Sequence, residues 1–208
     1  MSGPRVVVVT DPMCSWCWGM AHAVDDVVTS MGAQVDFDIL LGGINVHGTQ
    51  PIGDYGRRYL MRLWRDVEET TGQPFGYKLP DEYVHNSSRS CVAVEAVRQL
   101  TGKAPFDYLH ELQSLFFTQG LDVTSVDVLV AAAEKFDLDA DQFVKLLDDP
   151  AIIERVRFQF NSASAYGTNA LPCVLIDVDG TLRLLAGGYA DGDMLRQLVT
   201  EQVAQSES

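Results

Sequence analysis

Positive charge is scarce in this sequence. Lysine and arginine number 15 against 29 aspartates and glutamates, which gives a net charge of −14 with neutral histidines. Phosphate backbones and anionic membrane surfaces are bound by clustered lysines and arginines. The composition therefore predicts neither nucleic acid nor membrane as a partner.

Long apolar runs are also missing. No stretch approaches the roughly 20 apolar residues that a membrane-spanning helix needs. Residues 1–4 lead directly into the Val6–Val9 run, without the basic segment, apolar segment and cleavage site of a secretory signal. From these two absences we expect a cytoplasmic protein.

Cysteine is rare as well. Cys14, Cys17, Cys91 and Cys173 are too few for a disulfide scaffold in 208 residues, and in a reducing cytosol paired cysteines are more often catalytic or metal-binding. A structural zinc site needs two further ligands, and Cys91 and Cys173 do not form a second C-x-x-C, so we predict no metal. We expect Cys91 to pack inside a helix. Cys173 is expected to pack in a strand, with a role as an extra exchange partner as the alternative.

The most informative segment that is present is Cys14-Ser15-Trp16-Cys17. It follows the β-branched run 5–10, which is typical of a central strand, and precedes a helical stripe that ends at Gly32. The start of a helix presents free N–H groups and the positive end of the helix dipole, which favour a thiolate on the first sulfur. Two thiols so placed predict thiol–disulfide exchange.

The rest of the chain divides into three parts. A strand over 35–41 completes a strand–helix–strand unit in the first forty residues. Residues 173–178 and 181–185 flank an Asp179-Gly180 turn and predict a hairpin, after which Asp191 caps a final helix with Met194, Leu195, Leu198 and Val203 inward. Between roughly 50 and 167 almost every segment has helical periodicity, so the fold class is α/β with a helical insertion.

This order of elements, with C-x-x-C after the first strand, resembles the thioredoxin fold, and the insertion resembles its DsbA-like branch. Asp11 to Gly19 is similar to the motif of DsbA-family disulfide oxidoreductases, including the FrnE-like proteins. Three further segments are similar to that family, at 41–45, 86–89 and 170–172. The resemblance implies a thioredoxin-like domain in two halves, 1–48 and 168–208, around a helical domain at 49–167.

The resemblance also implies site residues. Cys14 becomes the nucleophile, Cys17 the resolving thiol, and Leu171-Pro172 a cis peptide facing them. Thioredoxins carry a buried aspartate in the strand before the motif, where this chain has Val8. Proton transfer to and from Cys17 must then use water or another group, with Asp11 as a candidate.

Trp16 lies between the two cysteines, where the first helical turn faces outward. We expect it to form part of an apolar rim that receives polypeptide, with the Leu171 backbone adding strand-like hydrogen bonds. The predicted function is a thiol–disulfide oxidoreductase for protein or low-molecular-weight disulfides. It needs no organic cofactor, and glutathione is a candidate reductant.

Two alternatives stay open. Kappa-class glutathione transferases and 2-hydroxychromene-2-carboxylate isomerases look like this architecture, but they usually have serine at the position of Cys14. A redox-sensing or chaperone-like binding module would use the cysteine pair as a switch.

Overall fold

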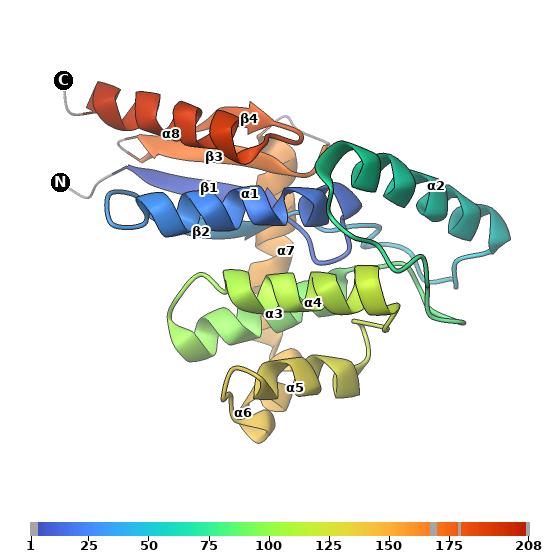
Figure 1. The fold of residues 1–208 in the computed structure, drawn as a ribbon. Helices are drawn as coiled ribbons and strands as arrows, with labels where there is room; N and C mark the ends of the chain where they lie inside the picture. The colour runs from blue at the N-terminus through green and yellow to red at the C-terminus, as the bar shows by residue number, and fades with distance from the viewer. Residues whose placement is uncertain (1–3, 167–169, 179, 207–208) are drawn as a thin grey trace.

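A computed structural model describes residues 4–166, 170–178 and 180–206. Its centre is a sheet in the order β2-β1-β3-β4, in which β1 runs parallel to β2 and antiparallel to β3, and β3 runs antiparallel to β4 (Figure 1). The sheet and the helices joined to it come from the two ends of the chain, as predicted. They are β1 (Arg5–Thr10), α1 (Ser15–Met31), β2 (Asp36–Leu41), β3 (Cys173–Val178), β4 (Thr181–Gly187) and α8 (Gly192–Ser206).

Six helices lie between β2 and β3, so the predicted thioredoxin-like fold with a DsbA-like helical insertion is confirmed. The division at 48/49 stays a prediction, and the boundary at 167/168 lies outside the described residues, as does the first residue of the Asp179-Gly180 turn. The six helices are α2 (Asp54–Thr71), α3 (Ser88–Thr101), α4 (Phe106–Gln119), α5 (Val126–Glu134), α6 (Ala140–Leu147) and α7 (Pro150–Ala165).

The alternation of side chains along β1 gives each face of the sheet its own core. Val6 and Val8 join the large core shared with α1, α8 and the insertion. Val7 and Val9 face the other way and pack with Ala163 of α7. Because both faces are covered, the unbroken valine run is buried throughout.

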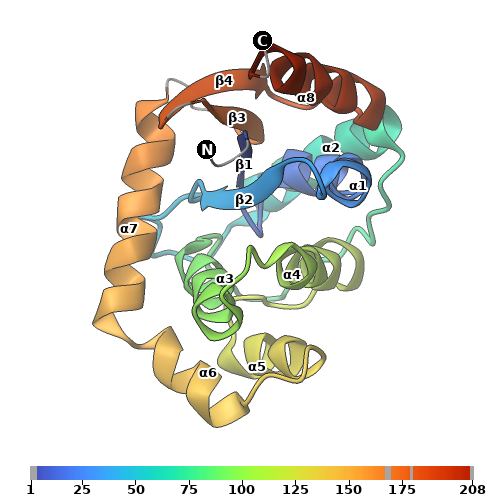
Figure 2. The same ribbon diagram turned by 90° about the vertical axis from the view of Figure 1, so that its left-hand side faces the viewer.

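Helix α7 links the insertion back to the sheet. It begins with Pro150 in its first turn after Asp149, whose carboxylate caps the helix by accepting from the Ala151 N–H at 2.7 Å. Figure 2 shows it running from the level of α6 to the sheet. There Gln159 Oε1 accepts the N–H of Leu41 at 3.0 Å, so α7 satisfies a backbone group on the outer edge of β2.

The final helix begins as predicted, since the Asp191 carboxylate accepts the N–H of Met194 at 2.8 Å. The expectation that Met194 points inward was wrong, because its side chain is 53% exposed. Leu195 and Val199, four residues apart, form the buried stripe of α8, and Met194 lies about 100° away from that stripe. Among the described helices, none has both the length and the apolar character to cross a membrane.

Candidate active site

Cys14 is the N-cap residue of α1, a position usually taken by serine, threonine or aspartate. Its Sγ atom accepts the backbone N–H of Cys17 at an N–S distance of 3.3 Å. The first turn of α1 contains no acidic residue. A sulfur in this position meets an N–H donor and lies at the positive end of the helix dipole.

Cys17 lies directly behind Cys14, and the side chains of the two residues share a hydrogen bond. Burial raises the pKa of the Cys17 thiol well above its usual range, and the hydrogen bond and charge of Cys14 raise the pKa further. The Thr10 side chain at the end of β1 also hydrogen-bonds to Cys17 and opposes this rise. Cys17 is therefore held as a neutral thiol beside the sulfur it would attack.

The Leu171-Pro172 peptide bond is cis, as the resemblance implied, and it faces Cys14. The Cys14 Sγ lies 3.7 Å from the Leu171 carbonyl oxygen, which accepts a hydrogen bond from the thiol. Gly42 lies against the Leu171 side chain, because a Cβ atom at Gly42 would come within 2.6 Å of both Leu171 methyl groups. Sequence segments at 14, 42 and 171 thus meet at one place.

A cavity of about 230 Å³ opens at this place. Of the two paired cysteines only Cys14 lines it, which makes Cys14 the sulfur that an incoming molecule can reach. The cavity is lined by Cys14, Gly42, Gly43, Ile44, Ala163, Ser164 and Leu171.

The other predicted site residues lie around this centre. Trp16 is half-buried and packs against the Tyr189 ring, with ring centroids 6.1 Å apart. Cys173 is buried on the α7 face of the sheet, in the cluster that Leu171 also contacts. Cys91 lies in α3 and contacts Asp11 without lining the cavity, and Cys14, Cys17 and Cys91 form no disulfide. In the described part of the chain, no three histidine, cysteine, aspartate or glutamate side chains are grouped as metal ligands.

Asp11 is fully buried between the cysteine loop and the insertion. One carboxylate oxygen accepts the Met13 N–H at 2.8 Å. The other accepts the Ile44 N–H at 3.1 Å, the Ser87 hydroxyl at 2.6 Å and the Cys91 thiol at 3.4 Å. Burial raises the pKa of the Asp11 carboxyl, and the hydrogen bonds oppose this rise only in part. Asp11 therefore ties the loop before Cys14 to the cavity wall and to α3.

Residues that we did not predict complete this cluster. Ser87, the N-cap of α3, binds Asp11 with its hydroxyl, and its own backbone N–H donates to the Ile44 carbonyl at 3.0 Å. Gln113 of α4 donates from Nε2 to the Asp11 carbonyl at 3.2 Å, while its buried Oε1 has no partner in the described structure. The similarity of segment 86–89 to the DsbA-like family could have pointed to Ser87 as a site residue. Nothing in the sequence pointed to Gln113.

Comparison with known proteins identifies the family. The family model described as "DSBA-like thioredoxin domain" matches residues 5–199, nearly the whole chain. The chain belongs to this family. It is thus a member of the DsbA-like thiol–disulfide oxidoreductases, which act on thiol and disulfide substrates.

Solved structures of this family share the fold. A "putative protein disulfide isomerase" from Nitrosomonas europaea superposes with a TM-score of 0.90 at 24% identity, covering 98% of this chain and 99% of that one. The cytosolic disulfide reductase DsbM from Pseudomonas aeruginosa gives 0.80 at 24% identity, covering 97% and 99%. DsbM has also been solved with GSH, with a TM-score of 0.77 at 22% identity, covering 96% and 99%.

Among curated proteins, the ClpXP adapter protein SpxH from Shouchella clausii is 24% identical over 171 residues. The match covers 81% of this chain and 56% of the adapter. The chain thus spans about half the length of the curated relatives it matches.

Proposed function

We propose that this protein exchanges disulfides with polypeptide or low-molecular-weight substrates through Cys14 and Cys17. The observation that carries the proposal is the position of the Cys14 sulfur. It caps α1, accepts the Cys17 N–H and borders a cavity that Leu171 also lines. A nucleophile in exchange must be reachable by the substrate and must have its negative charge stabilised as it reacts; this sulfur borders the cavity and accepts the Cys17 N–H.

The reaction proceeds in two exchanges. The Cys14 thiolate attacks one sulfur of the substrate disulfide, which forms a Cys14–substrate disulfide and releases the other sulfur as a thiolate. Cys17 then loses its proton and attacks the Cys14 sulfur, which releases the second substrate thiolate. Two electrons pass to the substrate and the protein is left with a Cys14–Cys17 disulfide. The reverse sequence oxidises a substrate dithiol.

Asp11 is proposed as an auxiliary residue in the second exchange. Its carboxyl group is buried near Cys17, and its charge contributes to the raised pKa of the Cys17 thiol. Burial raises the pKa of the Asp11 carboxyl, which makes its carboxylate a stronger base that can accept the Cys17 proton. Asp11 acts in addition as a positioning residue, because its backbone oxygen accepts the Cys14 N–H at 3.3 Å.

The substrate is proposed to lie over Trp16 and against the Leu171 backbone. Trp16 with Tyr189 offers an aromatic surface beside the cysteines, where apolar side chains of an unfolded polypeptide can pack. Leu171 itself is not part of a β-strand, so its backbone can form hydrogen bonds with an extended segment of substrate. Cys173 lies close to Leu171 and is a candidate auxiliary thiol.

We further propose a cytoplasmic protein that uses no organic cofactor and is returned to its dithiol state by glutathione. Two glutathione thiols reduce one Cys14–Cys17 disulfide and leave as oxidised glutathione, which balances the electrons. The GSH-bound form of the similarly folded cytosolic reductase DsbM supports this choice of reductant.

Insulin reduction tests the proposal directly. Cys14→Ser is expected to lower turnover at least about 100-fold, because the serine hydroxyl is not ionised at neutral pH. Cys17→Ser is expected to complete only the first exchange and to accumulate a protein–substrate disulfide, visible as a mass increase. Cys91→Ser is the matched control: it changes a buried thiol outside the cavity and keeps a donor for Asp11, so turnover should persist.

Each outcome separates this function from its alternatives. A redox sensor or chaperone-like module would show little turnover even in the wild type. A glutathione transferase or isomerase of the kappa-like class would keep activity on its substrate when Cys14 becomes serine. Turnover that survives Cys14→Ser would therefore refute the proposal.

A further inference from the structure

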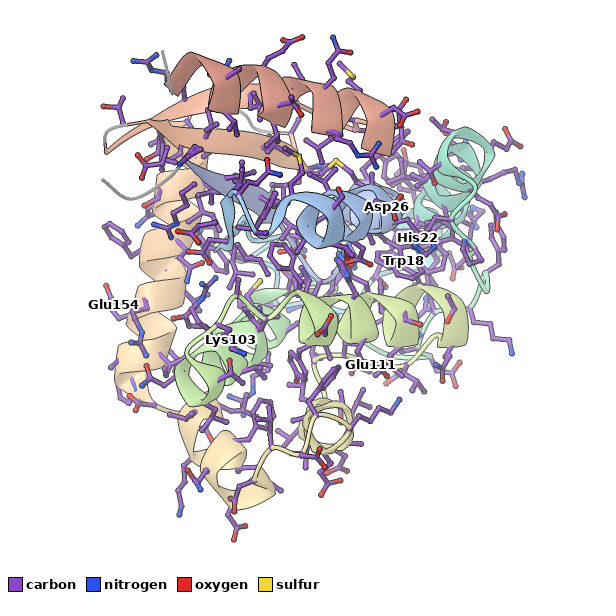
Figure 3. All side chains as sticks on the ribbon, turned by 60° about the vertical axis from the view of Figure 1, so that its left-hand side comes forward. Trp18, His22, Asp26, Lys103, Glu111 and Glu154 are labelled. Atoms are coloured by element: carbon purple, nitrogen blue, oxygen red, sulfur yellow. The ribbon has the colours of Figure 1, made fainter. Side chains whose placement is uncertain are left out.

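A second, larger cavity lies between α1 and α4, on a flank of the molecule that the exchange reaction does not use. Its volume is about 460 Å³, within the range of sites for small organic ligands. Trp18 forms an apolar part of its wall and is held in place by stacking on Phe117 at 6.3 Å and by donating its Nε1–H to the Pro74 carbonyl at 3.0 Å. Figure 3 shows Trp18 between α1 and α4, with His22 beside it.

The side chain of Gln73 borders this cavity, which is called the groove from here on. The residue lines the groove and is only 2% exposed, yet its side-chain amide has no hydrogen-bond partner among the described residues. Its amide atoms are not among the fully buried polar atoms that lack a partner, so they keep a small contact with solvent, which the groove provides. The groove is the place from which a partner for this amide can come.

Charge along the groove is negative. Asp25 of α1 meets His110 of α4 at 3.0 Å, and Glu111 pairs with Lys135 at 2.5 Å on the rim. Asp107 has no ion pair within the part of the chain that the structure describes. Asp25, Asp107 and Glu111 line the groove and one lysine lies beside them, so the groove attracts a cation.

The spacing of these groups selects the kind of cation. No three histidine, cysteine, aspartate or glutamate side chains among the described residues are grouped closely enough to hold a metal ion. The carboxylates are instead spread over two helices beside an apolar wall. This pattern suits an elongated molecule with a charged nitrogen and an apolar stem.

We propose that the groove between α1 and α4 binds an organic cation, an amine or guanidine carried on an alkyl chain. The nitrogen donates to Asp25 and Asp107, the Gln73 amide oxygen accepts a further N–H, and the stem packs on Trp18. The ligand is either a free amine or a basic side chain of a polypeptide. The net charge of −14 assists the approach of both.

Titration with agmatine, a guanidine on a four-carbon chain, tests this site. The indole N–H signal of Trp18, assigned with Trp18→Phe, is followed by nuclear magnetic resonance. We expect a saturable shift, weakened at least about fivefold by Asp25→Asn, by Asp107→Asn and by Gln73→Leu, since each removes one polar contact. The two aspartate variants change exposed or half-exposed residues, so they test the site even if Gln73→Leu fails to fold.

Asp26→Asn is the matched control. It makes the same change of charge one residue further along α1, but the Asp26 carboxylate points toward α8, where it would lie 3.7 Å from a Cβ at Gly192. Binding should be unchanged in this variant. Equal weakening by Asp25→Asn and Asp26→Asn would show a general effect of charge and overturn the proposal.

A second probe distinguishes the sources of the cation. A blocked peptide with one arginine that binds as agmatine does would assign the groove to basic groups in general. Binding of one probe alone would assign it to free amines or to polypeptide side chains. A dissociation constant above about 10 mM for both, or equal binding of neutral butylurea, would refute the site.

Discussion

Replacing Asp11 by asparagine isolates the contribution of its carboxylate. The side chain keeps its shape, but one of the two accepting oxygens becomes an NH₂ donor. The Ser87 hydroxyl and Cys91 thiol can rotate to adapt, whereas the backbone N–H groups of Met13 and Ile44 cannot. The Ile44 N–H also donates to the Ser87 Oγ at 2.7 Å, so the NH₂ is expected on that side, where it meets the Ile44 donor, while the Met13 N–H keeps its acceptor. The lost acceptor and the crowded donors cost at most about 1–3 kcal/mol in a buried position.

The pH dependence of this loss has a definite sign. The folded-state pKa of Asp11 is raised by burial, so the native protein binds this proton more tightly than the unfolded chain. The stability that protonated Asp11 contributes is therefore present at low pH and is lost as pH rises above the usual aspartate pKa of 3.8 and through the folded-state pKa. Asparagine does not titrate, so the deficit of Asp11→Asn is largest near about pH 4 and shrinks toward about pH 8.

Urea unfolding of both proteins across this range measures the difference. Asp26→Asn serves as the control for changing an exposed carboxylate, and its deficit should be small at every pH. A deficit of Asp11→Asn that grows as pH rises, or that is absent throughout, would refute our account of the buried carboxyl.

Three further outcomes are expected. Gly76→Ala should destabilise the protein by about 3 kcal/mol or more, because a Cβ at Gly76 would come within 1.9 Å of the Thr118 carbonyl oxygen; Gly53→Ala, which meets nothing within 4 Å, should cost far less in the same urea assay. Burial lowers the pKa of His85 to about 4 from 6.5, so the unfolding free energy should fall as pH drops from about 6.5 to 4, and His85→Phe should abolish this slope. Trp16→Ala should reduce turnover of insulin more than turnover of a small aromatic disulfide, and equal losses would contradict its role in binding polypeptide.

The elements of the fold could be predicted because their signals are local. The valine run of β1, the cysteine pair at its end and the cap at Asp191 are each visible within a few neighbouring residues. Residues 72–87 follow an irregular path that helical periodicity did not anticipate.

The site could be predicted only as far as the resemblance reached. The resemblance predicted that Leu171 and Pro172 lie beside Cys14, although Leu171 and Cys14 are 157 residues apart. The spacing of residues in the sequence does not predict such a contact. The hydrogen bonds of Asp11 to Ile44 and Ser87 span 33 and 76 residues and leave no periodic signal. Asp11 was therefore named as a candidate, but its attachment to the insertion was not foreseen.

The distance along the chain between Cys14 and Leu171 has a consequence for biosynthesis. A ribosome adds Leu171, which borders the Cys14 thiol, 157 residues after Cys14. At about 5–20 residues per second, Cys14 and Cys17 of the nascent chain stay exposed for roughly 8–30 seconds before the Leu171 segment that borders Cys14 is synthesised. During that interval the pair is open to oxidants and to other nascent chains.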